Sequence, residues 1–295
     1  MDTEERIRPD YLTVKELADL LRIKERKVYD LAASGGVPCI KVTGKLLFPT
    51  SEIHTWIARG RSAGGARDPR PAVFLGSHDP LLDWAIRQSR SGLATLFDGS
   101  LDGLARFRAG EGMATGLHVH DPRSDDWNVP AVQAECADRN AVLVAWAIRR
   151  RGLVMRGGDA GAITGFADLP GRTIVSRQAE SGAQRLLEHK LDESGIAPGR
   201  IAWTPVVHSE SDAVLSVAQG AACAAFGLEA LARPYGLHFV PLVEERFDLL
   251  VDRRAWFDPP MQRLLAFCAT AEFRDHAETL AGYDLGVNGE IRWNG

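Results

Sequence analysis

The fold of the larger part of this 295-residue chain is decided by one stretch, Thr173-Ile174-Val175-Ser176-Arg177-Gln178-Ala179-Glu180-Ser181-Gly182-Ala183-Gln184-Arg185-Leu186-Leu187. It begins as a short β-branched run and ends with the apolar spacing of a helix. Ser181 followed three residues later by Gln184 has the spacing of a capping box. A strand that leads directly into a capped helix points free backbone N–H groups at one place, where Arg177 could add a positive charge. The pattern predicts an anion-binding turn, although an ordinary βα turn with a salt-bridged arginine would have the same sequence.

The same order of apolar run, small polar turn and helix recurs through residues 72–295. Asp79 and Pro80 form a strong helix start, an N-cap followed by proline at the first helical position. This alternation predicts α/β architecture, in which ligands bind beyond the carboxyl ends of the strands. Ser77, Ser100 and Ser181 each lie at such a turn, so we expect a neutral cage of hydroxyl and N–H groups suited to a desolvated anion. Strands are predicted at 72–75, 93–97, 113–119, 141–146, near 175, and at 201–207, 222–226 and 239–242, with further helices at 81–89, 101–108 and 210–219.

Several motifs, most of them at these turns, resemble those of a known protein family. They are Gly76-Ser77-His78-Asp79-Pro80, Gly99-Ser100-Leu101-Asp102-Gly103-Leu104, Gly116-Leu117-His118, Asn128-Val129-Pro130, Arg177-Gln178 with Ser181-Gly182, and Phe239-Val240-Pro241-Leu242. Together they resemble the cytoplasmic relatives of periplasmic molybdate-binding proteins across nearly all of residues 72–250. The resemblance implies a type 2 periplasmic-binding-protein fold, with two α/β lobes and a ligand cleft between them. The residues expected to bind the ligand are Ser77, His78, Asp79, Ser100, His118, Trp127, Asn128, Arg177, Gln178, Ser181, Gly182 and His208.

The sequence departs from that family's usual pattern at the 176–184 turn. Glu180 replaces a glycine and adds negative charge, Ala183 removes a hydroxyl, and Gln184 removes a cation. Trp127 replaces the usual tyrosine before Asn-Val-Pro. The resemblance implies molybdate or tungstate as effector, whereas these changes also fit a small organic anion, an amphoteric metabolite or a degenerate site.

Residues 1–60 follow a different plan. Thr13-Val14-Lys15-Glu16 is a capping box that opens a first helix. A second helix follows from Glu25 to about Ser34, then two β-like runs, 37–42 and 46–48, with Gly44 suited to a hairpin turn. A third helix is expected from Glu52 to Ala58. This order predicts a winged helix-turn-helix, whose second helix fits the major groove and whose wing reaches the DNA backbone.

The motifs of this front end are Tyr11-Leu12-Thr13-Val14-Lys15-Glu16-Leu17-Ala18-Asp19-Leu20-Leu21, Lys27-Val28-Tyr29, Pro38-Cys39-Ile40-Lys41-Val42, Leu47-Phe48-Pro49 and Glu52-Ile53-His54-Thr55-Trp56-Ile57. They resemble the excisionase-type, MerR-like DNA-binding domain from end to end. One departure is that the second helix lacks a Ser or Thr cap near Lys24-Glu25. A small helical protein-interaction module is the alternative. The residues expected to contact DNA are Lys24, Arg26, Lys27, Tyr29, Lys41 and Lys45.

Composition and charge fit this division. The formal net charge is −4, but residues 1–71 carry 13 Lys and Arg against 10 Asp and Glu, and the remainder carries 22 against 29. The asymmetry suggests a DNA-facing front end and an acidic body. Residues 61–71, rich in Gly, Pro and Arg, read as a linker between a 1–60 domain and a 72–295 domain. No long apolar segment or signal-peptide core is present, so the cytoplasm is expected.

Other chemistry has weaker support. The four cysteines, at 39, 136, 223 and 268, form no CxxC pair and read as small apolar residues. His118 and His120 alternate along a predicted strand, which would put both imidazoles on one face, but no further ligands at metal spacing follow, so we expect no metal and no cofactor. His208-Ser209-Glu210-Ser211-Asp212 contains triad residue types too close in sequence to converge readily, and Ser209 is expected to cap the next helix. No nucleophile elbow is present, so we expect no enzyme.

The resulting hypothesis is a one-component transcriptional regulator. We expect it to bind an operator in double-stranded DNA as a homodimer and to sense a small anion in a cleft between two α/β lobes, with no membrane partner. The first alternative is a ligand-independent, excisionase-type DNA-binding protein whose body is a dimerisation unit. The second is an enzyme of the same fold.

Overall fold

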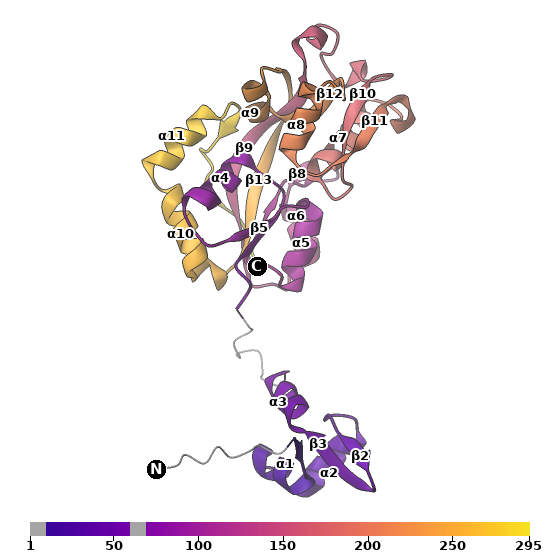
Figure 1. The fold of residues 1–295 in the computed structure, drawn as a ribbon, viewed down its shortest axis with the longest axis vertical. Coiled ribbons are helices and arrows are strands. Elements are labelled where there is room, and N and C mark those ends of the chain that lie inside the picture. Colours follow the sequence, from indigo (N-terminus) through magenta and orange to yellow (C-terminus); the bar gives the residue numbers. More distant parts are fainter. Residues whose placement is uncertain (1–9, 60–68) are drawn as a thin grey trace. The chain divides into compact units, whose positions relative to one another are not determined.

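The computed structural model describes residues 10–59 and 69–295, and these two ranges belong to two separate compact units (Figure 1). Most of the expected linker, residues 61–71, lies outside the described residues. Its last part differs from that expectation, because Arg70 is fixed to the second unit. Its Nε donates to Asp252 Oδ2 at 2.9 Å and its Nη1 to the carbonyl oxygens of Phe107 and Gly112. Arg70 is therefore part of the body.

The first unit packs three helices against a small antiparallel sheet. The helices are α1 (Val14–Leu21), α2 (Glu25–Ala33) and α3 (Thr50–Arg59), and the sheet has the order β1 (Tyr11–Leu12), β3 (Lys45–Pro49), β2 (Ile40–Val42). The capping box is confirmed, since Thr13 Oγ1 accepts from the backbone N–H of Glu16 and the Glu16 carboxylate accepts from that of Thr13. The wing turns through Thr43 and Gly44, both at positive φ, as in a type I′ hairpin. Only β1 was not expected, because two residues are too short to show a period.

A ten-stranded sheet forms the frame of the body (Figure 1). Its main order is β11-β10-β12-β9-β13-β6-β4-β5, and two 15-residue strands, β9 (Ala141–Met155) and β13 (His238–Asp252), pair antiparallel through its middle. Residues 69–148 and 246–295 form what we call lobe A, and residues 149–245 form lobe B. We call β9 and β13 the hinge strands because they run through both lobes. The other strands are β4 (Val73–Gly76), β5 (Ala94–Leu96), β6 (Ala114–Leu117), β10 (Thr173–Arg177), β11 (Ala202–Val207), β12 (Ala224–Leu228), β14 (Tyr283–Asp284) and β15 (Ile291–Asn294).

Each lobe has helices on both faces of its part of the sheet. In lobe A, α4 (Pro80–Gln88), α10 (Pro259–Cys268) and α11 (Ala271–Thr279) cover one face through a core that includes Phe74, Phe247 and Phe273. Helices α5 (Ser100–Ala109) and α6 (Val129–Cys136) cover the other face, where Phe107 and Leu143 are buried. Asp79 caps α4 as predicted, accepting from the backbone N–H of Leu82 at 2.7 Å.

Lobe B repeats this layering with fewer elements. Helix α7 (Gly182–Glu193) buries Leu186, Leu187 and Leu191 against one face of the sheet. Helix α8 (Glu210–Ala218) covers the other face through Val214 and Val217. Ser209 caps α8, as predicted, by accepting from the backbone N–H of Asp212. Smaller elements are the hairpin β7 (His120–Asp121) with β8 (Asp126–Trp127), helix α9 (Glu229–Ala232), and 3₁₀ turns at Gly157–Asp159, Phe166–Asp168, Pro198–Arg200, Arg233–Tyr235 and Ala255–Phe257.

The first hinge strand is longer than predicted. The sequence analysis predicted a strand at 141–146, which ends before the polar run Arg149-Arg150-Arg151. In the structure the strand continues to Met155, and Arg149 and Arg151 are fully buried. Among the described residues, no helix is long and apolar enough to span a lipid bilayer.

Candidate functional site

The winged helix-turn-helix unit presents its basic residues to solvent. All six residues predicted to contact DNA are exposed, namely Lys24, Arg26, Lys27, Tyr29, Lys41 and Lys45. Helix α2 starts at Glu25 after Lys24 as N-cap, with no side-chain capping bond. Val28 turns into the core and is fully buried, whereas Tyr29 is 53% exposed. The side of α2 opposite Val28 is therefore open to a partner.

The predicted convergence of the polar turns in the body is confirmed for Ser77 and Ser100. Their hydroxyl oxygens lie 2.7 Å apart, and the backbone N–H of His118 donates to Ser100 Oγ at 3.1 Å. The turn before α7, in lobe B, meets the turn before α5, in lobe A. The backbone N–H of Leu101 donates to the carbonyl oxygen of Glu180 at 3.3 Å. The lobes are thus in direct contact at the expected site, and the serine hydroxyls bond to each other.

The predicted capping box at Ser181 is wrong. Ser181 is the N-cap of α7, but its side chain accepts no capping hydrogen bond. Gln184 turns back instead, and its Oε1 accepts from the backbone N–H of Arg177 at 2.9 Å. A buried N–H at the end of β10 would otherwise lack a partner, which explains why the amide is used there.

Arg177 is held by partners within lobe B, although its buried Nη1 has no hydrogen-bond partner among the described residues. Its Nε and Nη2 donate to the carbonyl oxygens of Val207 and His208, and its Nη1 lies 3.3 Å from Glu210 Oε1. Gln178 links the lobes, since its Nε2 donates to the carbonyl oxygens of Asp98 and His208 at 3.2 Å. The imidazole of His208 lies beside Asp98, on the surface.

Three other predicted ligand residues have structural partners. Asp79 Oδ2 accepts from Arg149 Nη1 at 2.8 Å and from the Tyr283 hydroxyl at 2.5 Å. Asn128 Oδ1 accepts from the backbone N–H of Val119, and its Nδ2 donates to Asp248. His78 packs edge-on against Phe97 and lies 3.9 Å from Asp83. Gly182 abuts the backbone of His118, where an added Cβ would lie 2.4 Å from the carbonyl oxygen.

A buried charge network, which the sequence analysis missed, lies at this lobe contact. Glu245 on β13 accepts hydrogen bonds from Arg149 and Arg151 on β9, and Arg151 also donates to Glu210. His118 Nδ1 lies 3.1 Å from Glu245 Oε2. A continuous chain of ion pairs therefore runs from lobe A to lobe B, through Asp79, Arg149, Glu245, Arg151, Glu210 and Arg177. Its three arginines and three carboxylates balance in charge.

Burial and pairing act in opposite directions on these groups. Burial alone would raise the pKa of Glu245, but Arg149 and Arg151 outweigh it and hold that pKa well below its usual value. Burial also opposes ionisation of Glu210, yet its arginine partners Arg151 and Arg177 lower the pKa to about 2. Burial lowers the pKa of His118, which favours the neutral ring. The sequence signal for the network was the alternation of Arg149 and Arg151 inside an apolar strand, which puts both side chains on one face.

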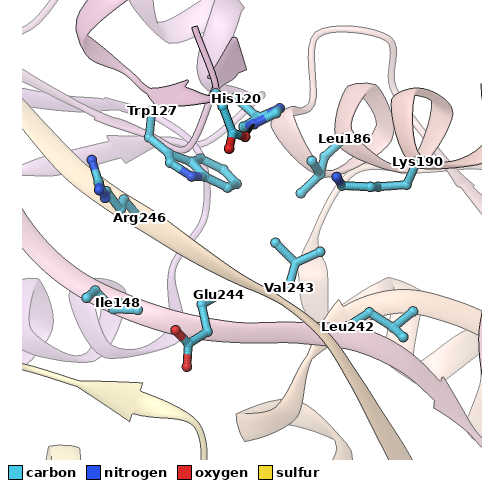
Figure 2. Close-up of a pocket in the computed structure, with 10 residues that line it drawn as sticks. His120, Trp127, Ile148, Leu186, Lys190, Leu242, Val243, Glu244 and Arg246 are labelled. Carbon is cyan, nitrogen blue, oxygen red and sulfur yellow. Dashed lines mark hydrogen bonds and ion pairs between the residues drawn. The ribbon is translucent and has the colours of Figure 1, made fainter. Parts of the chain in front are cut away.

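A separate pocket of about 390 Å³ lies beside this network (Figure 2). Ten residues from both lobes and the hinge strands line it: His120, Asp125, Trp127, Ile148, Leu186, Lys190, Leu242, Val243, Glu244 and Arg246. We call it the hinge pocket. Of the predicted ligand residues, Trp127 alone lines it. His118 and His120, expected on one face, are separated: the first joins the charge network, and the second lines the hinge pocket.

No group of three or more His, Cys, Asp or Glu side chains among the described residues is placed to hold a metal ion. The four cysteines are free thiols. Burial raises the pKa of Cys268 to about 12, so this thiol is not activated.

Comparison with known proteins agrees with the two units. A helix-turn-helix domain model matches residues 11–61. Over 299 aligned residues the chain is 22% identical to the uncharacterised protein YvgK of Bacillus subtilis (strain 168), covering 95% of this chain and 96% of that protein.

Solved structures with a similar fold include two binding proteins. The alkanesulfonate-binding protein SsuA of Xanthomonas axonopodis pv. citri is 17% identical, with 73% of this chain and 80% of that chain covered and a TM-score of 0.44. The periplasmic binding protein STM4351 of Salmonella typhimurium, described as having high arginine specificity, is 14% identical, with coverage of 70% and 97% and a TM-score of 0.48.

A model described as "PBP superfamily domain" matches residues 84–269, more than half of the chain. The matched region includes both hinge strands, the charge network from Arg149 to Glu245, and all of lobe B. The chain belongs to the PBP superfamily domain family, with a helix-turn-helix domain at its N-terminus.

Proposed function

We propose that the protein is a cytoplasmic DNA-binding transcriptional regulator whose two-lobed body binds a small-molecule effector. The observation that carries the proposal is the joining, in one chain, of a helix-turn-helix unit whose second helix exposes Arg26 and Lys27 and a body of the PBP superfamily. Arg26, Lys27 and Tyr29 on α2 are exposed and form no ion pair among the described residues. Such residues are available for phosphate and base contacts.

The DNA-binding step uses both basic elements of the first unit. Helix α2 has the size and charge to enter a major groove, and Lys41 and Lys45 on the β2–β3 wing would contact the backbone beside it. Phosphate contacts supply affinity, while base-edge contacts from α2 supply sequence preference. Two half-sites would need two copies of the chain, so a homodimer remains part of the proposal.

The effector step uses the relation between the lobes. A molecule that binds better to one arrangement of the lobes shifts the population toward it, and this shift can alter the affinity for DNA. If the hydroxyls of Ser77 and Ser100 both donate to molybdate or tungstate, the effector implied by the resemblance, the hydrogen bond between them would have to break. An organic effector in the hinge pocket would not require this change.

One observation favours a second candidate, a ligand-independent DNA-binding protein. Glu245 and Glu210 already neutralise the buried arginines at the lobe contact, as a ligand carboxylate would. A body held closed by its own ion pairs could act only as a scaffold or dimerisation unit for the DNA-binding domains.

The test uses the full chain and a duplex selected from a randomised library. Fluorescence anisotropy would measure DNA affinity alone and with molybdate, tungstate, sulfate, phosphate, small organic acids or amino acids. We expect selective DNA binding and a change in affinity of about 5- to 150-fold with one compound class, the usual range for coupled sites. Failure to select any duplex would reject DNA binding. Tight binding unaffected by every compound would favour the ligand-independent candidate.

A further inference from the structure

We propose that the hinge pocket binds a small zwitterion, a molecule with one carboxylate, one ammonium group and a compact apolar side group. This inference rests on the proposed function, since the zwitterion would be the effector, but it names the site and the ligand class. It differs from the anion site expected at the polar turns. The evidence comes from the size of the pocket, its apolar lining and its unpaired charged groups.

The size of the hinge pocket favours an organic molecule. Its volume of about 390 Å³ lies within the roughly 300–1,000 Å³ typical of small-molecule sites. A tetrahedral oxyanion has four oxygens, which at about 30 Å³ each, the share of a water molecule in the liquid, would fill roughly 120 Å³. An oxyanion would therefore leave most of the pocket empty.

One side of the pocket is apolar. Trp127, Leu186 and Val243 face the same hollow, and Leu242 and Ile148 extend it along the hinge strands (Figure 2). Trp127 is 8% exposed, so its ring is a fixed wall. Burial of an apolar side group against these residues would remove apolar surface from water and so favour binding.

Charged side chains of both signs line the rim of the pocket. Two cations, Lys190 and Arg246, and two carboxylates, Asp125 and Glu244, line it. Lys190 is already paired with Glu193, and Arg246 Nη1 with Asp126 at 2.9 Å. With these partners counted, four carboxylates accompany the two cations, so the rim favours a ligand that includes a positive group.

Two charged side chains at the rim of the pocket have polar atoms that are free to bind a ligand. Arg246 uses only Nη1, so its Nε and Nη2 have no partner among the described residues and can hold a carboxylate. The Glu244 carboxylate forms no hydrogen bond or ion pair within the same described part of the chain, so it can accept an ammonium group. Because Glu244 and Arg246 are both exposed and flank buried Glu245 on β13, their groups point away from the charge network.

His120 supplies an independent sign of a missing partner. Its side chain is 8% exposed, its Nε2 lies 3.0 Å from Asp125, and its Nδ1 is buried without a hydrogen-bond partner in the described structure. A polar ligand group in the pocket could satisfy this nitrogen once the ring turns to expose it.

The origin of the lining residues connects binding to lobe position. His120, Asp125 and Trp127 come from the β7–β8 hairpin of lobe A, and Leu186 and Lys190 come from α7 of lobe B. A ligand held by both would stabilise one arrangement of the lobes. The same helix, α7, begins at Gly182 against the backbone of His118, so the pocket and the lobe contact share an element.

Thermal unfolding and calorimetry of the full chain would test the ligand class. The probes are L-phenylalanine and L-leucine, with phenylacetate lacking the ammonium group, phenethylamine lacking the carboxylate and glycine lacking the apolar group. We expect one of the two apolar zwitterions to bind and each truncated probe to bind at least tenfold more weakly. The absence of binding by both zwitterions at millimolar concentration, or equal binding of phenylacetate, would overturn the proposal.

Two variants would locate the site. Arg246→Met and Glu244→Gln should each weaken binding at least tenfold, whereas the matched surface variants Arg87→Met and Glu272→Gln should not. Unchanged binding in both pocket variants, or its loss in Ser100→Ala alone, would place the ligand elsewhere and reject the inference. Selective DNA binding that responds to molybdate or phenylacetate instead would reject the zwitterion while leaving the proposed function intact.

Discussion

Arg151 and Glu245 form a two-point ion pair between the hinge strands, with Nε–Oε2 at 2.6 Å and Nη2–Oε1 at 3.0 Å, and both side chains are completely buried. The planar fork of the guanidinium matches the carboxylate, so both oxygens are held. Arg149 donates to the same carboxylate from two residues away on β9. Glu245 is therefore the central anion of the network that links the lobes.

Replacement of this anion should destabilise the body strongly. Glu245→Gln removes one negative charge and leaves Arg149 and Arg151 undercompensated in a buried site. Breaking a buried pair in this way costs about 3–5 kcal/mol. Urea unfolding of the full chain would measure the loss of stability. The transition can be followed by tryptophan fluorescence, because all but one of the tryptophans lie in the body.

The neighbouring carboxylate provides the control for that experiment. Glu244→Gln changes the same chemical group one residue away, but Glu244 is exposed and unpaired among the described residues, so we expect a change within about 0.5 kcal/mol. Equal effects of the two variants on the free energy of unfolding would contradict the role given to Glu245.

The buried carboxyl group of Asp248 should make the folded protein less stable as pH rises. Burial raises its pKa from 3.8 to about 6, although the hydrogen bond from Asn128 lowers it in part. The folded state then holds its proton more tightly than the unfolded state, so stability is lost as pH rises from about 4 to 6. Asp248→Asn should remove this penalty and stabilise the protein at pH 7 by about 1–3 kcal/mol, with little effect below pH 4. Thermal unfolding of the wild-type protein and of Asp248→Asn across this pH range would show the difference in stability. If the melting temperatures of the two proteins changed in parallel with pH, Asp248 would not be the source of the pH dependence.

Much of the fold could be predicted because its signals are local. Thr13 with Glu16, Asp79 with Pro80, and Ser209 with Asp212 each mark a helix start within four residues, and all three caps are present. The alternation of strands and capped helices similarly predicted the α/β body. Local patterns cannot show that one strand serves two lobes, so the length of β9 was missed.

The candidate site was harder to predict because its partners are distant in sequence. Arg149 meets Asp79 across 70 residues and Glu245 across 96. Arg177 was expected to bind an external anion, but the fold brings Glu210 to it. Ser181 and Gln184 have capping-box spacing, yet the nearby N–H of Arg177 takes the amide instead. In each case a tertiary partner replaced the one suggested by local spacing.

The basic face of α2 gives a prediction about DNA. Arg26→Ala with Lys27→Ala should weaken binding of the full chain to its selected duplex and flatten the dependence of affinity on salt. Each lost phosphate contact lowers the slope of log K against log salt by about 0.9. Anisotropy titrations at several salt concentrations would give that slope. Arg87→Ala, which removes an exposed arginine from α4, is the control, and an identical slope in all three proteins would exclude α2 as a phosphate-binding element.

Gly182 provides a test of the lobe contact itself. A Cβ there would lie 2.4 Å from the carbonyl oxygen of His118, so Gly182→Ala must push the start of α7 away from lobe A. Gly182 lies in an α-helix, where alanine is intrinsically favoured by up to about 1 kcal/mol, and so a loss of stability would come from the contact. We expect a lower melting temperature and a larger radius of gyration of the body by small-angle scattering. Gly199→Ala is the control, because an added Cβ there has no neighbour within 4 Å. If Gly182→Ala instead raised the melting temperature, helix propensity would outweigh the contact, and the lobes would not be held together at this position.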